Sequence, residues 1–134
     1  MRRDDWLPRL LAYTESVRAV PYEPVKHNCA LFVAGAVKEM REDDPVSGLG
    51  VTLESLRDVV EALNKFGGVA GICRAYFNSE MLPAIQARRG DVVIKPGIDG
   101  DTIGICMGTH ALFLGPDGLQ VRGLDECSGS WRVE

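Results

Sequence analysis

The sequence has few of the side chains on which most catalytic and metal sites depend. Only two of its 134 residues are histidines, His27 and His110. Its four cysteines are widely separated and include no C-x-x-C pair: Cys29, Cys73, Cys106 and Cys127. Because a zinc site needs closely spaced cysteine or histidine ligands, we expect no metal site. A glycine-rich phosphate loop is also missing, so we expect no cofactor.

Long apolar runs and an excess of basic charge are absent as well. No apolar run approaches the roughly 18 residues of a membrane-spanning helix, so we expect no membrane span. The chain has 15 basic and 19 acidic residues, a net charge of −4, which argues against nucleic acid as a partner. The first residues lack the apolar centre of a secretory signal. We therefore expect no signal peptide, synthesis in the cytoplasm and reduced thiols.

What the sequence does have is enough apolar residues for one core. Hydrophobic residues make up 46% of the chain, and its length suits a single domain covering residues 1–134.

The first two expected helices have clear start signals. Asp4 and Asp5 can cap a helix whose apolar residues follow helical spacing and which should end near Val20. Asn28 is a favoured N-cap residue, and the apolar run after it predicts a second helix from Cys29 to Met40. Since this second helix is apolar on most sides, it should be central to the fold.

A third helix is predicted after an acidic loop. The composition of residues 41–50 indicates a surface loop, and Thr52 can cap a helix that stops at Gly67-Gly68. Residues 69–89 fit either a short helix or irregular structure.

From residue 90 onward the pattern indicates strands. The segments "GDVVIKPG", "TIGICMG", "ALFLGPDG", "LQVRG" and "SWRV" are short, apolar and separated by Gly, Pro and Asp. Such spacing is typical of an antiparallel meander. Helices at about 4–66 followed by strands at about 90–133 predict an α+β fold, with the helices on one face of the sheet.

Cys29 is the most distinctive candidate for chemistry. At the first turn of a helix, unpaired backbone N–H groups and the helix dipole stabilise a thiolate. A cysteine there can equally be a small apolar core residue. Nucleophilic catalysis also needs a base within hydrogen-bond reach, so the assignment depends on the two histidines.

The order of several motifs resembles the NlpC-type papain-like cysteine peptidases. These are the Asn-Cys pair that opens an apolar helix, then "RRGDVVI" and "TIGICMG". Further features resemble a branch encoded among the tail-tip genes of siphophages and phage-like gene transfer particles: Asp44-Pro45, the two glycines after the third helix, "GPDGL" and the closing "WRV". The resemblance covers roughly residues 20 to 133 and implies an NlpC/papain-like version of the α+β fold.

The resemblance assigns roles to three positions. Cys29 falls on the family's nucleophile, Asn28 on the polar residue before it, and Thr102 on the catalytic histidine. Threonine cannot deprotonate a thiol near neutral pH. His110 lies on the order of 25 Å from the Thr102 end of its strand, since a strand advances about 3.3 Å per residue. His27 precedes the helix cap, so both histidines are weak candidates for the base.

The resemblance implies a structural component of a phage or phage-like tail tip with a degenerate peptidase fold. We would then expect it in the tail of the virion, after synthesis in the host cytoplasm. Its partners would be other tail-tip or hub proteins, through anchors such as Trp6, Leu7 or the "SWRV" segment. The alternative is an active cysteine peptidase or amidase that cleaves host peptidoglycan during entry. A free-standing cytosolic domain fits the composition equally well.

Overall fold

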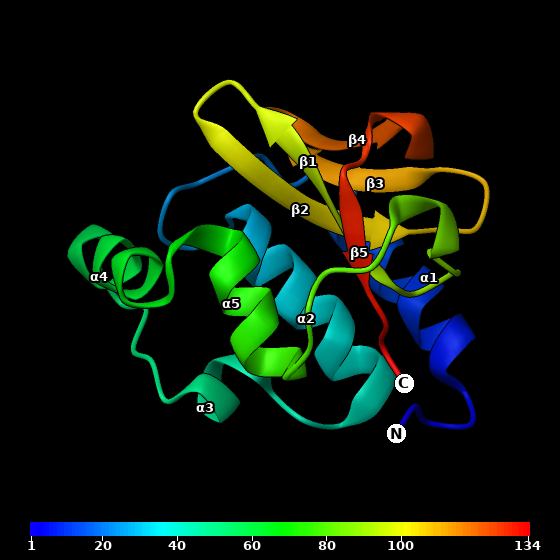
Figure 1. Ribbon diagram of the computed structural model, residues 1–134, viewed down its shortest axis with the longest axis horizontal. Helices are drawn as coiled ribbons and strands as arrows, with labels where there is room; N and C mark the ends of the chain where they lie inside the picture. Colours follow the sequence, from blue (N-terminus) through cyan, green and yellow to red (C-terminus); the bar gives the residue numbers. More distant parts are fainter.

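A computed structural model describes all residues from 1 to 134 as two layers, with helices packed on one face of a five-stranded antiparallel sheet (Figure 1). The helices are α1 (Trp6–Val17), α2 (Cys29–Arg41), α3 (Pro45–Leu49), α4 (Leu56–Phe66) and α5 (Gly68–Phe77). The strands are β1 (Val92–Gly97), β2 (Gly100–Cys106), β3 (Ala111–Gly115), β4 (Gly118–Arg122) and β5 (Gly129–Trp131). The α+β prediction is confirmed. No helix has the length and apolar character that a membrane crossing needs.

The central helix α2 begins where the sequence predicts. The side-chain oxygen of Asn28 accepts a hydrogen bond from the Leu31 N–H at 2.9 Å, which satisfies one of the unpaired donors of the first turn. Phe32, Val33 and Met40 are buried on the faces that meet α1 and the sheet. This packing fixes the position of Cys29 at the start of the helix.

Two predictions about the helices are wrong. Residues 45–49 are not a loop but the short helix α3, since the Asp44 side chain accepts from the Val46 N–H and Pro45 takes the first helical position. Helix α4 is capped by Ser55 rather than Thr52, with the Ser55 hydroxyl accepting from the Asp58 N–H at 3.1 Å. The segment left open forms α5 and then a 3₁₀ turn at Ala84–Gln86.

The sheet has the order β4-β3-β2-β1-β5. Its first four strands form the predicted meander, but β5 returns to pair with β1 at the other edge, where Val92 lies opposite Trp131. Trp131 is fully buried, and its indole N–H donates to the Ser79 carbonyl at 3.2 Å. The "SWRV" segment therefore packs into the protein's own core and is not an exposed interface anchor.

The two faces of the sheet have different surroundings. Ile103 and Ile105 of β2 face the helices and pack with Phe32. Cys106 and Phe113 belong to a smaller apolar cluster on the other face, where Cys127 packs. Side chains alternate along a strand, so each residue of β2 can be assigned to one face.

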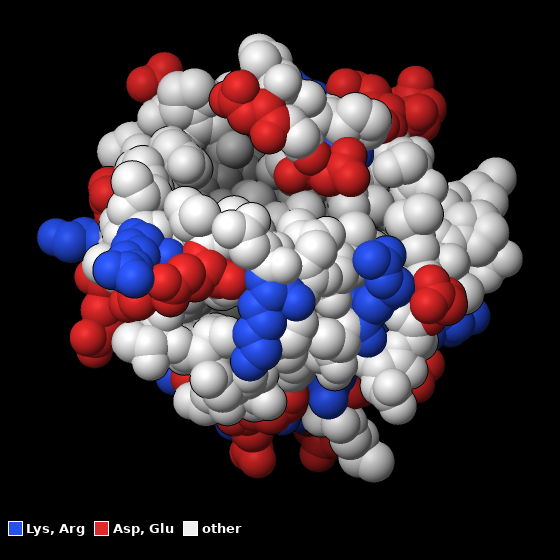
Figure 2. Space-filling model, turned by 60° about the vertical axis from the view of Figure 1, so that its left-hand side comes forward, with Lys and Arg blue, Asp and Glu red and all other residues white.

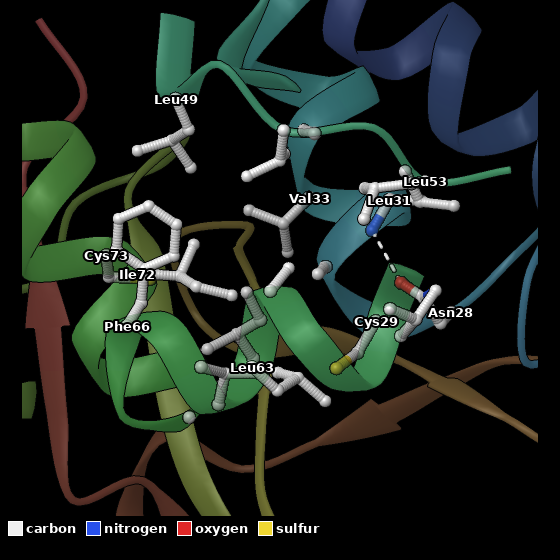
Figure 3. A pocket seen from close by; sticks show the side chains of 18 of the residues that line it. Asn28, Cys29, Leu31, Val33, Leu49, Leu53, Leu63, Phe66, Ile72 and Cys73 are labelled. Carbon is white, nitrogen blue, oxygen red and sulfur yellow. Dashed lines mark hydrogen bonds between the residues drawn. The ribbon is translucent and has the colours of Figure 1, made fainter. Parts of the chain in front are cut away.

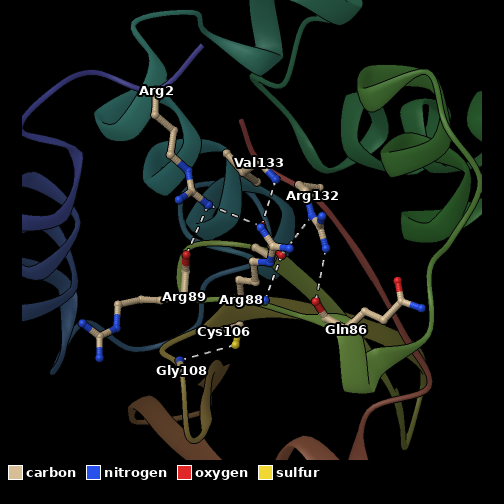
Figure 4. Close-up of polar contacts among 9 residues, drawn as sticks. Arg2, Gln86, Arg88, Arg89, Cys106, Gly108, Arg132 and Val133 are labelled. Atoms are coloured by element: carbon tan, nitrogen blue, oxygen red, sulfur yellow. Dashed lines mark hydrogen bonds and ion pairs between the residues drawn. The ribbon is translucent and has the colours of Figure 1, made fainter.

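A buried carboxylate joins the start of β1 to both ends of the chain, and we call this cluster the Asp91 junction (Figure 4). Asp91 is 1% exposed and accepts hydrogen bonds from the Arg88 N–H at 2.9 Å and the Val133 N–H at 3.0 Å. The guanidinium groups of Arg2, at 3.4 Å, and Arg132, at 3.9 Å, supply the opposite charge. Two backbone donors and two positive charges thus surround this carboxylate.

Candidate functional site

An apolar cavity of about 500 Å³ lies on the helical side of the protein. It lies between α2, α3, α4, α5 and the turn that joins β1 to β2, and 24 of its 32 lining residues are hydrophobic. Figure 2 shows it as a hollow surrounded mainly by uncharged groups, with acidic side chains at one edge. Its volume falls within the range of about 300 to 1,000 Å³ typical of ligand pockets. We call it the Cys29 cavity.

Cys29 lies at one end of this cavity. It is the first residue of α2, is half-buried, and points its sulfur toward apolar side chains that include Leu63 (Figure 3). Asn28 precedes it and is 8% exposed. Both polar atoms of the Asn28 side chain are engaged, because its oxygen caps α2 and its amide donates to the Pro24 carbonyl at 2.9 Å. Asn28 therefore has a structural task at the start of α2.

His27 is adjacent in sequence but lies outside the lining of the cavity. Its ring packs edge-on against Phe32, with 6.5 Å between ring centroids, and Phe32 stacks on Tyr13 of α1. The Nε2 atom of His27 is buried without a hydrogen-bond partner, and burial lowers the pKa of the imidazole. The ring thus belongs to the side of α2 that meets α1, so the structure does not bring it together with the thiol.

Thr102 also fails to meet Cys29. It pairs with Lys95 on the sheet, while its neighbour Ile103 faces the helices. Because successive residues of a strand point to opposite faces, the Thr102 side chain is on the far side of the sheet from α2. Asp101 is on the helix side and lines the cavity, as does Asp99 in the preceding turn.

His110 is at the opposite end of β2. It lies in the turn before β3, where its Nδ1 is 3.1 Å from the Thr109 hydroxyl. The cavity meets β2 only near Asp101 and Ile103. Neither histidine of the chain therefore contributes to the site around Cys29.

A second thiol, which the sequence did not single out, lines the same cavity from α5. Burial, with a smaller contribution from Cys29, raises the pKa of Cys73 to about 12. This residue is 3% exposed and therefore stays a neutral thiol at physiological pH. Cys73 was missed because the segment around it fits either a short helix or irregular structure when judged from the sequence alone.

The chemistry available in the Cys29 cavity is that of an apolar binding site. Two carboxylates, Asp99 and Asp101, are its only charged lining residues. A thiol at a helix start is present, but no imidazole accompanies it. Catalysis by a cysteine–histidine pair requires a contact of about 3 Å, which this arrangement does not provide.

The chain matches over residues 1–133 the model of a family described as a domain of unknown function, DUF6950. It therefore belongs to that family. A search of the curated proteins found no match.

Proposed function

We propose that this protein is a non-hydrolytic component of a phage or phage-like tail tip, with a degenerate NlpC-like peptidase fold used for binding. The observation that carries the proposal is the cavity beside Cys29, whose lining includes no imidazole. A cysteine at the start of a central helix packed on a sheet fits the resemblance to NlpC-type peptidases. The tail-tip context comes from that resemblance alone.

An active cysteine peptidase or amidase is the second candidate. The orientation of Cys29 favours it, because the thiol lies at a helix N-terminus and points into a cavity. Activity would require His27 to leave its position against Phe32 and approach the sulfur. Burial of the imidazole disfavours its charged form, whereas a thiolate–imidazolium pair needs that form.

The decisive experiment measures hydrolysis and thiol reactivity together. Purified protein and Cys29→Ala are incubated with peptidoglycan, and released fragments are analysed by mass spectrometry. Alkylation of Cys29 is followed by peptide mapping in wild type, His27→Ala and His110→Ala. We expect no fragments from either protein and equal alkylation rates in all three. Cleavage that disappears in Cys29→Ala, with slower alkylation in one histidine variant, would establish the peptidase instead.

The tail-tip assignment has its own test. Particles purified from a producing strain should contain the protein, and it should remain with the tail hub after mild dissociation. Recovery only in the free cytosolic fraction would contradict the assignment.

A further inference from the structure

We propose that the Cys29 cavity is a receptor for a basic, apolar segment of a partner protein. Apolar side chains of this segment enter the cavity, and a lysine or arginine beside them pairs with Asp99 and Asp101. This inference rests on the proposed binding function and specifies the chemistry of the partner.

The walls of the cavity determine the apolar part of the ligand. Residues from four helices contribute hydrocarbon surface, including Val33, Leu49, Leu63 and Ile72 (Figure 3). An occupant that covers this surface gains about 25 cal/mol for each Å² of apolar area removed from water. A polar ligand such as a sugar would leave its hydroxyl groups unpaired here.

The charges at the mouth determine the basic part. Asp99 and Asp101 lie in the β1–β2 turn and at the start of β2, and both are exposed. Neither carboxylate forms an ion pair or a side-chain hydrogen bond within the protein, and no lysine or arginine lines the cavity. A cationic group on the ligand would complement this edge, and an anionic group would be repelled.

The rim shows why the occupant is a protein segment and not a small amphiphile. Three apolar residues that border the cavity extend into solvent: Tyr22 is 51% exposed, Leu56 56% and Val60 47%. Ile98, next to Asp99, is fully exposed at the tip of the turn. A ligand held inside the cavity would leave these side chains in water. A macromolecular partner would cover both the cavity and its apolar rim.

Helix α4 provides the adaptable wall of this receptor. It is strongly amphipathic and packs chiefly against α5, and only Ala62 among its residues is buried. Leu56, Val59 and Val60 therefore present an apolar face to the cavity, and Leu56 and Val60 remain largely exposed. An amphipathic segment laid against such a face is a common mode of peptide recognition.

Binding can be tested with two designed peptides. The first is a blocked 14-residue peptide with leucines at helical spacing and lysines elsewhere, and the second has glutamate at every lysine position. Binding is measured by fluorescence anisotropy at low salt. We expect the lysine peptide to bind at least about tenfold more tightly than the glutamate peptide, since one oriented ion pair with two carboxylates is sufficient for that ratio.

Matched variants locate the binding. Leu56→Gln with Val60→Gln should weaken the lysine peptide, whereas Ile85→Gln, at an exposed apolar residue outside the cavity, should not. Asp99→Asn with Asp101→Asn should remove most of the preference for lysine, whereas Asp117→Asn in the exposed turn after β3 should retain it. All six substituted positions are exposed surface or rim residues, so the four variants should fold.

Thiol protection gives a second readout at the site itself. The bound lysine peptide should slow the alkylation of Cys29 in the cavity. Cys127, which is half-buried on the far face of the sheet, is the internal control and should react at an unchanged rate.

Each remaining outcome overturns the proposal. Equal binding of the two peptides would show that Asp99 and Asp101 do not select a basic ligand. Failure of both peptides to bind would show that the cavity is not a receptor for such a segment. Octylammonium is included as a free amphiphile; if it binds and protects Cys29 while both peptides fail, the occupant is a small ligand. The peptidoglycan assay is independent of all these results, so failure of the receptor leaves the non-hydrolytic assignment standing.

Discussion

The Asp91 junction and the Cys29 cavity each contain one ionisable side chain next to the start of a core element, but the surroundings of the two side chains are opposite in character. Asp91 is surrounded by two backbone donors and two guanidinium groups. Cys29 faces a mainly apolar cavity whose lining includes no imidazole. The first region pairs its buried carboxylate with hydrogen-bond donors and opposite charge, as a structural site requires. The second region retains empty space and apolar surface that nothing in the protein fills, as a binding site requires.

Among the tests of this comparison, we expect the largest change in stability from a substitution in the Asp91 junction. Asp91→Ala leaves two backbone N–H groups without their acceptor and removes the negative charge beside Arg2 and Arg132, so we expect a loss of about 3 to 5 kcal/mol in the free energy of unfolding. Urea denaturation measures it. Asp117→Ala, at an exposed carboxylate, should change stability by no more than about 0.5 kcal/mol. A loss below about 1 kcal/mol at Asp91 would mean that the junction is not structural.

A matched pair of leucines sharpens the contrast in packing. Leu10 of α1 is fully buried, whereas Leu63 of α4 is half-buried and lines the cavity. Leu10→Ala should cost about 2 to 5 kcal/mol in thermal or urea unfolding, and Leu63→Ala only about 1 kcal/mol, because Leu63 already faces empty space. Both changes are the same substitution within a helix, so helix propensity cancels. Equal losses would show that the cavity walls are as tightly packed as the core.

The cap of α2 should contribute a smaller amount. Asn28→Ala removes the acceptor for the Leu31 N–H and the donor to the Pro24 carbonyl, and we expect a loss of about 1 kcal/mol in unfolding free energy. Asn28→Asp retains the acceptor and should lose less. If Asn28→Asp is instead the more damaging change, repulsion between the new carboxylate and the Pro24 carbonyl outweighs the retained cap.

The smallest effect concerns pH. Burial lowers the pKa of His27 below its usual value of 6.5, so the unfolded chain binds its proton first as pH falls. The stability of the protein should therefore be complete above about pH 6.5 and should decline below it as the unfolded state is favoured by protonation. Urea midpoints between pH 5 and 7.5 would show a smaller decline in His27→Gln than in wild type. His110→Gln, which retains His27, should keep the wild-type decline.

Local signals predicted local structure well. Asn28 before an apolar run correctly located the start of α2, and the glycines at 67 and 68 correctly marked the end of α4. The cap of α4 was misassigned because Thr52 and Ser55 are equally good capping residues three positions apart. Helix α3 was missed because its five residues carry no periodic pattern, although Asp44 followed by Pro45 was a usable start signal.

Features that join distant segments could not be predicted in this way. Nothing in the chain order indicates that β5 returns to β1, since that pairing depends on the whole sheet. The cavity is equally invisible, because its walls come from segments spread between Tyr22 and Ile103. The orientation of Thr102 was a partial exception: the apolar residues Ile103 and Ile105 indicate which face of β2 meets the helices, and Thr102 is out of phase with them.

The joint between α4 and α5 has a consequence for how the protein meets different partners. Gly67 and Gly68 both have positive φ, at 81° and 87°, and a side chain at either would find open space. Glycine at both positions is thus required by backbone conformation and not by packing. One wall of the proposed receptor is therefore joined to α5 through the two residues with the least restricted backbone, and this joint is where α4 would move if partners of different size were to enter.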